Sequence, residues 1–239
     1  MNGWGFLTVL LLASAGGSVC AQTTADSTFS LFFNSSLNFN HANDPHINRW
    51  LKEYGYPTEP HVPTSMSFEA AAMPANSRLL YSVHLSAITN ASNLTAFNLG
   101  AGLFEALVKS KDFLFLLGGS MGYHADIVSL DGNLPPAYED LSVKYNTPLA
   151  LRRSGISFAP MLRIFFYPVR FGKIARLGLI GGAGYVVDLN SNWRLGYYSG
   201  EHGRYNHFRK LVNKPNDQRK VSEHGICLSA GISLRFDLH

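Results

Sequence analysis

The sequence predicts an all-β protein, an eight-stranded antiparallel up-and-down transmembrane β-barrel with short periplasmic turns and long extracellular loops. Three observations predict this fold. Eight segments alternate apolar residues with small or polar ones, and the connections between them alternate between tight and long. Charged residues make up only 15% of the 239 residues, while Gly occurs 22 times. A soluble domain usually has about a quarter charged residues, so this composition favours a surface that largely meets lipid.

The last segment of the chain shows the alternation most clearly. Apolar residues occupy every second position: Ile226, Leu228, Ala230, Ile232, Leu234, Phe236 and Leu238. One face of such a strand suits hydrocarbon and the other does not. We expect strands of this kind at 28–38, 65–73, 79–88, 95–107, 113–126, 155–167, 175–187 and 225–238. Each is long enough to cross a tilted path through a bilayer, which takes about 9 to 11 residues.

The apolar positions of every strand are predicted to face outward. On the second strand these are Met66, Phe68 and Ala70, and the other strands repeat the rule. Glu105 interrupts the outward row of the fourth strand, so a β-bulge or an interfacial position is expected there.

The connections sort by length onto the two ends of the predicted barrel. Segments 74–78, 108–112 and 168–173 are tight and polar or contain Pro, which is typical of periplasmic turns. Segments 39–64, 127–154 and 188–224 are long, and only 89–94 is short at that end. Long connections at one end are typical of the extracellular loops of an outer-membrane barrel.

The inward positions are predicted to fill the barrel with small and charged side chains. Eight strands leave an interior just wide enough for side chains, so we expect a filled lumen rather than a pore. An unpaired charge between the walls costs several kcal/mol. We therefore expect a polar network in the lumen in which three arginines meet three acids: Arg163, Arg176, Arg235, Glu69, Asp126 and Asp237.

The first 21 residues have the pattern of a secretory signal peptide. An apolar run from Phe6 to Leu12 precedes Val19-Cys20-Ala21, which fits a small-x-small cleavage site. A lipidated Cys20 is the alternative, but Val19 stands where Gly or Ala is typical. Cleavage would leave residues 22–239 as the barrel domain, with Cys227 as its single cysteine and no internal disulfide. No later apolar run approaches the roughly 18 residues of a membrane helix.

With these features the chain resembles the small eight-stranded outer-membrane β-barrel proteins of Gram-negative bacteria, of the OmpA and OmpX kind. The resemblance rests on the start Ala21-Gln22, the alternating strands, the parity of the long connections and the outward aromatic Phe236 near the end. Family members usually end on an aromatic residue, whereas this chain ends on His239. The resemblance implies a location in the cell outer membrane and insertion by the outer-membrane assembly machinery. It is specific for fold and location only.

Two long connections contain candidate contact surfaces. Segment 46–54 is predicted to form a short amphipathic helix, which would either pack over the barrel mouth or engage a partner or lipid headgroups. The last connection combines an excess of positive charge with aromatic residues, and its candidate contacts are Trp193, Arg204, Arg209, Lys210, Arg219 and Lys220. These residues suit the phosphates of lipopolysaccharide or an extracellular partner. An ordinary solvated loop is the alternative.

The leading hypothesis is a non-enzymatic outer-membrane barrel that is structural or binds through its surface loops. One alternative is a hydrolase acting on lipid A, for which His84, Ser86 and Glu105 would be the candidates. Strand parity turns Glu105 away from the other two, so no catalytic residue is assigned. A less favoured alternative is a secreted lipocalin-like carrier, which would need apolar residues inside instead of outside.

Other classes of function find no support in the sequence. The formal net charge of +4 is not gathered into one run, so no nucleic-acid partner is expected. The nine histidines lack the close spacing of a metal site, and no Gly-rich phosphate loop is present. We therefore expect neither a metal nor a cofactor.

Overall fold

The computed structural model describes residues 29–41, 52, 64–88, 94–130, 149–189, 194–199, 207–210 and 224–238. Its strands are β1 (Phe29–His41), β2 (Thr64–Pro74), β3 (Leu79–Ile88), β4 (Leu94–Lys109), β5 (Phe113–Leu130), β6 (Leu149–Phe171), β7 (Ala175–Asp188), β8 (Arg194–Ser199), β9 (His207–Lys210) and β10 (His224–Leu238). Within this described part of the chain, no helix is long and apolar enough to span a membrane.

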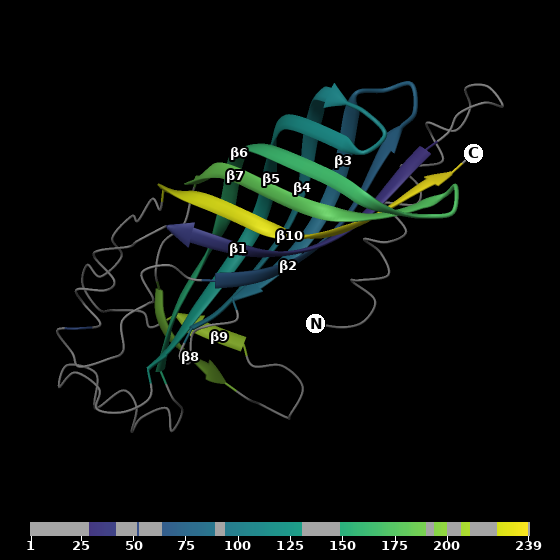
Figure 1. The fold of residues 1–239 in the computed structure, drawn as a ribbon. Helices are drawn as coiled ribbons and strands as arrows, with labels where there is room; N and C mark the ends of the chain where they lie inside the picture. The colour runs from purple at the N-terminus through teal and green to yellow at the C-terminus, as the bar shows by residue number, and fades with distance from the viewer. Residues whose placement is uncertain are drawn as a thin grey trace, which may run out of the picture.

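Eight of the strands close into an antiparallel barrel. Its order is β5-β4-β3-β2-β1-β10-β7-β6, and pairing between β5 and β6 completes the circle. Figure 1 shows the first and last strands, β1 and β10, side by side in the wall. Closure pairs the edges that an open sheet would expose. The eight predicted strands and their antiparallel order are confirmed.

Short connections gather at one end of the barrel, which we call the tight-turn end. They are 75–78, 110–112 and 172–174. The expected turn at 168–173 is wrong in its bounds, because β6 continues to Phe171. Pro168 is accommodated by a bulge between Phe166 and Val169, where its missing N–H removes no regular ladder hydrogen bond. Gly172 then makes the turn with a φ of +65°, a conformation that favours glycine.

The opposite end, which we call the long-connection end, has more strand than expected. Strands β5 and β6 stay paired up to Leu130 and Leu149, so parts of the predicted loop 127–154 belong to the sheet. Strand β7 pairs with β6 only as far as the pair Ser157 and Asp188. This leaves the start of β6 uncovered on that side, and β8 pairs there along residues 149–152. Strand β9 pairs with β8 in turn, and Figure 1 shows this hairpin beyond the barrel. The expected continuous loop 188–224 is corrected accordingly.

The outward face of the barrel is apolar, as the alternation predicts. Phe68 is 55% exposed, Ile232 56% and Leu179 58%, whereas the alternate positions on their strands point into the lumen. Glu105 lies on the outward face. The bulge expected near it occurs between Ala106 and Val108, with Leu107 as the extra residue. The bulge leaves Leu107 and Val108 both exposed on the outside.

Candidate functional site

The lumen of the barrel holds the charged and polar side chains that are candidates for function. From the tight-turn end to the long-connection end it has three levels: a cluster of ion pairs, an apolar plug and a polar cavity. Each level is assembled by residues of the same inward parity on neighbouring strands.

At the tight-turn end, Asp237 accepts hydrogen bonds from three directions. Ser30 Oγ and Arg235 Nε each donate to its Oδ1 at 2.7 Å. Arg176 Nε donates to its Oδ2 at 3.0 Å. Charge-assisted hydrogen bonds of this kind are the stronger ones in proteins. The sequence predicts this group of Arg176, Arg235 and Asp237, and the ion pairs bring the three together.

Asp112 extends this cluster into the turn between β4 and β5. Arg176 Nη1 donates to its Oδ1 at 2.8 Å, and Arg170 donates to both of its carboxylate oxygens. Hydrogen bonds from the Arg170 guanidinium hold the pKa of Asp112 below its ordinary value of 3.8. Arg176 therefore bridges Asp112 and Asp237, and the carboxylates are matched by guanidinium groups.

The apolar plug fills the next level of the lumen. Its members are large side chains with no solvent exposure: Phe32, Leu80, Phe104, Leu114, Leu116, Phe165 and Tyr167. The rings of Phe165 and Tyr167 stack with centroids 6.2 Å apart, and the ring of Phe32 packs against Phe165 at 5.8 Å. Tyr167 Oη satisfies its hydrogen bonding with Ser233 Oγ at 2.9 Å. The sequence predicts a filled lumen but not that apolar rings fill it.

A buried ion pair lies above the plug. Arg163 Nη1 donates to Glu69 Oε1 at 2.6 Å, and Asn34 Nδ2 donates to Glu69 Oε2 at 3.2 Å. The guanidinium carbon of Arg163 lies 4.1 Å from the centre of the Phe104 ring. This is a favourable distance for a cation–π contact. The expected pairing of Arg163 with an acid is met by Glu69.

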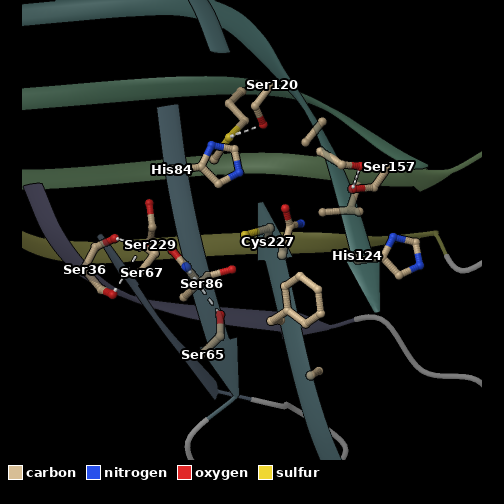
Figure 2. Close-up of a pocket in the computed structure, with 18 of the residues that line it drawn as sticks. Ser36, Ser65, Ser67, His84, Ser86, Ser120, His124, Ser157, Cys227 and Ser229 are labelled. Atoms are coloured by element: carbon tan, nitrogen blue, oxygen red, sulfur yellow. Dashed lines mark hydrogen bonds between the residues drawn. The ribbon is translucent and has the colours of Figure 1, made fainter. Parts of the chain in front are cut away.

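Beyond this pair the lumen opens into a polar cavity of about 210 Å³. The cavity exists because many of the side chains that line it are small. Seven of these lining residues are serines: Ser36, Ser65, Ser67, Ser86, Ser120, Ser157 and Ser229. Figure 2 shows Ser36 and Ser67 close together, and their hydroxyl oxygens are 2.7 Å apart. His124 and Ser157 lie on the other side of the cavity. The cavity is large enough for several waters, each of which occupies about 30 Å³ in the liquid.

Charged groups also line the long-connection end of the cavity. Asp126 pairs with Arg153, which lies directly across from it on β6. The expectation that Asp126 meets Arg163, Arg176 or Arg235 is therefore wrong, because those three arginines lie closer to the tight-turn end of the lumen. His124 Nε2 lies 3.4 Å from Asp188 Oδ2. Sequence reasoning missed Arg153 and Asp188, although both continue the inward parity of β6 and β7 just past the predicted strand ends.

The residues weighed for hydrolysis do not share a site. His84 and Ser86 line the lumen cavity, whereas Glu105 lies on the exposed outer face near the other end of β4. Among the described residues, no group of three or more His, Cys, Asp or Glu side chains is placed to hold a metal ion. Cys227 is buried in the lumen wall.

Several sequence predictions fall outside the described residues. These are the signal peptide at 1–21, the remainder of the helix at 46–54 apart from Lys52, and four candidate contacts of the last connection: Trp193, Arg204, Arg219 and Lys220. Arg209 and Lys210 belong to β9, which places their backbone next to β8.

The fold and lumen together define a class: a closed eight-stranded antiparallel barrel, apolar outside and filled by ion pairs, rings and small polar groups inside. No protein-family model matches the sequence. No curated protein sequence matches it either. Among solved structures, the chain is similar to the crystal structure of Neisserial surface protein A (NspA), with 9% identity and a TM-score of 0.44 over 88% of this chain and 97% of that one. It is also similar to the outer membrane protease OmpT of Escherichia coli, with 6% identity and a TM-score of 0.33 over 90% of this chain and 98% of that one.

Proposed function

We propose that this chain is a non-enzymatic barrel of a Gram-negative outer membrane, which reinforces the membrane or binds an extracellular partner through its long connections. The outward face carries this proposal. Large apolar side chains such as Phe68, Met121 and Leu179 are more than half exposed around the wall. A soluble monomer rarely exposes a contiguous apolar patch of more than a few hundred Å², so a bilayer is the solvent that fits this face.

The height of the apolar band supports the same proposal. On β6 the outward positions from Ile156 to Phe166 are all exposed. Ten residue steps of about 3.3 Å, tilted by about 40°, span roughly 25 Å along the barrel axis. This is about the height of the apolar band of an outer-membrane barrel. A soluble carrier barrel has the opposite faces, with its apolar side chains turned toward a ligand.

The non-enzymatic part of the proposal is supported by the separation of candidate catalytic groups. His84 and Ser86 line the lumen, whereas Glu105 faces outward. The lumen charges instead pair with one another at short range, as Glu69 does with Arg163. Buried ion pairs of this kind make the barrel more rigid when every polar group in them has a hydrogen-bond partner.

The surface-binding part of the proposal concerns lipopolysaccharide. The last connection contains more Lys and Arg than acids, together with Trp and Tyr. Lys and Arg bind phosphates, and aromatic residues anchor at a membrane interface. The hairpin of β8 and β9, which belongs to this connection, extends from the barrel at the long-connection end.

Two experiments test this function. The exported chain should fractionate with the outer membrane, and the folded barrel should migrate differently on a detergent gel before and after boiling. A chain found in the soluble fraction, with no shift on boiling, would contradict the membrane assignment.

The second experiment measures binding to lipopolysaccharide. Replacing Arg204, Arg209, Lys210, Arg219 and Lys220 by Gln should weaken binding of the refolded barrel to immobilised lipopolysaccharide. The matched control keeps the charge at the same positions, as Arg204→Lys, Arg209→Lys, Lys210→Arg, Arg219→Lys and Lys220→Arg, and should bind normally. Equal binding by both variants would remove lipopolysaccharide as the partner.

A further inference from the structure

The tight-turn end carries the whole excess of positive charge of the barrel wall. In β1 to β7, β10 and their three tight turns, the charges elsewhere balance: Arg152, Arg153 and Arg163 against Glu69, Asp126 and Asp188. At the tight-turn end seven cations face three acids: Arg78, Lys109, Lys111, Arg170, Lys173, Arg176 and Arg235 against Glu105, Asp112 and Asp237. This end therefore has an excess of four positive charges.

Two of the three acids at this end, Asp112 and Asp237, are already engaged, and several of the cations are not. Asp112 and Asp237 each accept hydrogen bonds from two arginines. Arg78, Lys111 and Lys173 are exposed and form no ion pair with any described residue. Their charges are consequently available to an anion from outside the chain.

The turns also form a concave surface whose charged side chains are all positive. An open concavity of about 520 Å³ is lined by residues 75–78 and 109–111 and by Arg235, with no acidic side chain among them. Lys109 Nζ is held in place because it donates to the carbonyl oxygens of Ala75 at 2.7 Å and Ser77 at 2.8 Å. The ammonium group of Lys109 thus links the end of β4 to the turn at 75–78 and is held in a fixed position.

Each tight turn sets an exposed cation beside an exposed large apolar residue. Arg78 precedes Leu79, Lys109 follows Val108, and Lys173 precedes Ile174. Leu79 and Val108 are exposed at the ends of β3 and β4, and Ile174 is exposed in its turn, so the cations lie at the edge where the apolar outer face ends. Long basic side chains at the edge of an apolar band place their charge at the headgroups of a bilayer.

We propose that the tight-turn end is a binding surface for the phosphate groups of anionic phospholipids in the leaflet that this end meets. This inference rests on the proposed membrane location. Lys and Arg near an anionic membrane surface each strengthen binding, and the effect fades within a Debye length. A zwitterionic headgroup offers the same phosphate next to a cation of its own, so the surface prefers lipids with a net negative charge.

The experiment titrates the full chain, folded in zwitterionic detergent, with short-chain phosphatidylglycerol and follows backbone amide chemical shifts. Short-chain phosphatidylcholine and inorganic phosphate are separate probes. We expect shifts at the three tight turns, strongest with phosphatidylglycerol and weakened by added salt. The variant R78Q/K111Q/K173Q should bind phosphatidylglycerol roughly 100-fold more weakly, at about fivefold per cation. The charge-conserving variant R78K/K111R/K173R should bind as the parent does.

Three results would overturn the inference while leaving the barrel in the membrane. They are equal binding of the two phospholipids, unchanged binding by the neutral variant, and inorganic phosphate binding as tightly as phosphatidylglycerol, which would identify a site for a soluble anion. A chain that forms no barrel in detergent or in vesicles of either lipid would overturn the proposed function, and this inference with it.

Discussion

The two halves of the lumen are built differently, although the same eight strands enclose both. Toward the tight-turn end the inward positions carry large aromatic side chains such as Phe32, Phe165 and Tyr167, and these side chains are completely buried. Toward the long-connection end the inward positions carry mainly Ser, Gly, Asn and His, and a cavity of about 210 Å³ remains. One half is packed as the core of a soluble domain is packed, and the other is a polar hollow.

The two halves therefore have different physical roles: the apolar half stabilises the barrel, and the polar half contains the free space. Burial of apolar rings stabilises a fold and fixes its shape. A hollow lined by hydroxyl groups contributes little packing but holds water and leaves room. The Glu69–Arg163 pair lies at the boundary, where it contacts the plug through Phe104. Substitutions on either side of this boundary should therefore have unequal effects.

The largest effect is expected from breaking the boundary pair itself. Glu69→Gln leaves the buried guanidinium of Arg163 without its counter-charge, which should lower the free energy of unfolding by about 3–5 kcal/mol. Urea unfolding of the barrel in vesicles measures this loss. The double variant Glu69→Gln/Arg163→Met should recover part of it, because no charge is then left unpaired. A single variant as stable as the parent would contradict the role of the pair.

An effect of similar size distinguishes the plug from the cavity. Phe165→Ala opens a void among packed rings and should cost about 3–5 kcal/mol. The control Ser120→Ala removes one hydroxyl from the cavity wall, where it contacts the Met161 sulfur at 3.8 Å, and should cost no more than about 1 kcal/mol. The same unfolding measurement compares them. Equal losses would show that the two halves contribute alike.

The third prediction adds a methyl group instead of removing a ring. At Gly178 a Cβ atom would clash with the carbonyl oxygen of Phe166 and the ring of Tyr167, so Gly178→Ala should cost about 1–3 kcal/mol. At Gly181, on the same strand, the nearest atom to such a Cβ is the Ser229 carbonyl oxygen at 4.0 Å. Gly181→Ala should leave the unfolding midpoint unchanged or raise it. The reverse order would contradict the close approach at Gly178.

The smallest effect concerns the ion cluster that closes the plug. Because Arg170 lowers the pKa of Asp112 below 3.8, the stabilisation from this carboxylate is complete above that pH. It is lost as the pH falls through the lowered pKa. Asp112→Asn should therefore lower the unfolding midpoint at neutral pH and make no difference in acid. High salt should reduce the effect, since the pair is exposed. Identical pH profiles for parent and variant would contradict it.

Strand positions and faces could be predicted from the sequence because a period of two is a strong signal over long strands. Phe68 and Ile232 are exposed as their parity requires, and Glu69 and Arg235 are inward. Ion-pair partners could be predicted only in part, because parity shows whether a side chain points into the lumen but not its position along the barrel axis. Asp126 shows the limit: it meets Arg153 because of register, which the alternation alone does not specify.

The plug could not be predicted by the same reasoning. Where both parities are apolar, as in Phe113 to Leu117, alternation cannot separate outward-facing from lumen-facing residues. Leu114 and Leu116 are fully buried, while Leu117 is exposed. The extension of β6 to Phe171 was missed because Pro168 normally ends a strand, and the bulge that accommodates it leaves no clear mark in the sequence.

The central claim is that hydrocarbon surrounds this barrel, and one pair of substitutions tests it most directly. Ile232, at the middle of the outward row of β10, is 56% exposed, and Ile174, in a tight turn, is 50% exposed. In a bilayer Ile232→Arg should cost about 2–4 kcal/mol and Ile174→Arg about 0–1 kcal/mol, measured by unfolding the barrel from vesicles. If water surrounded the barrel, two exposed isoleucines would tolerate arginine equally. Equal and small losses for both variants would contradict the account.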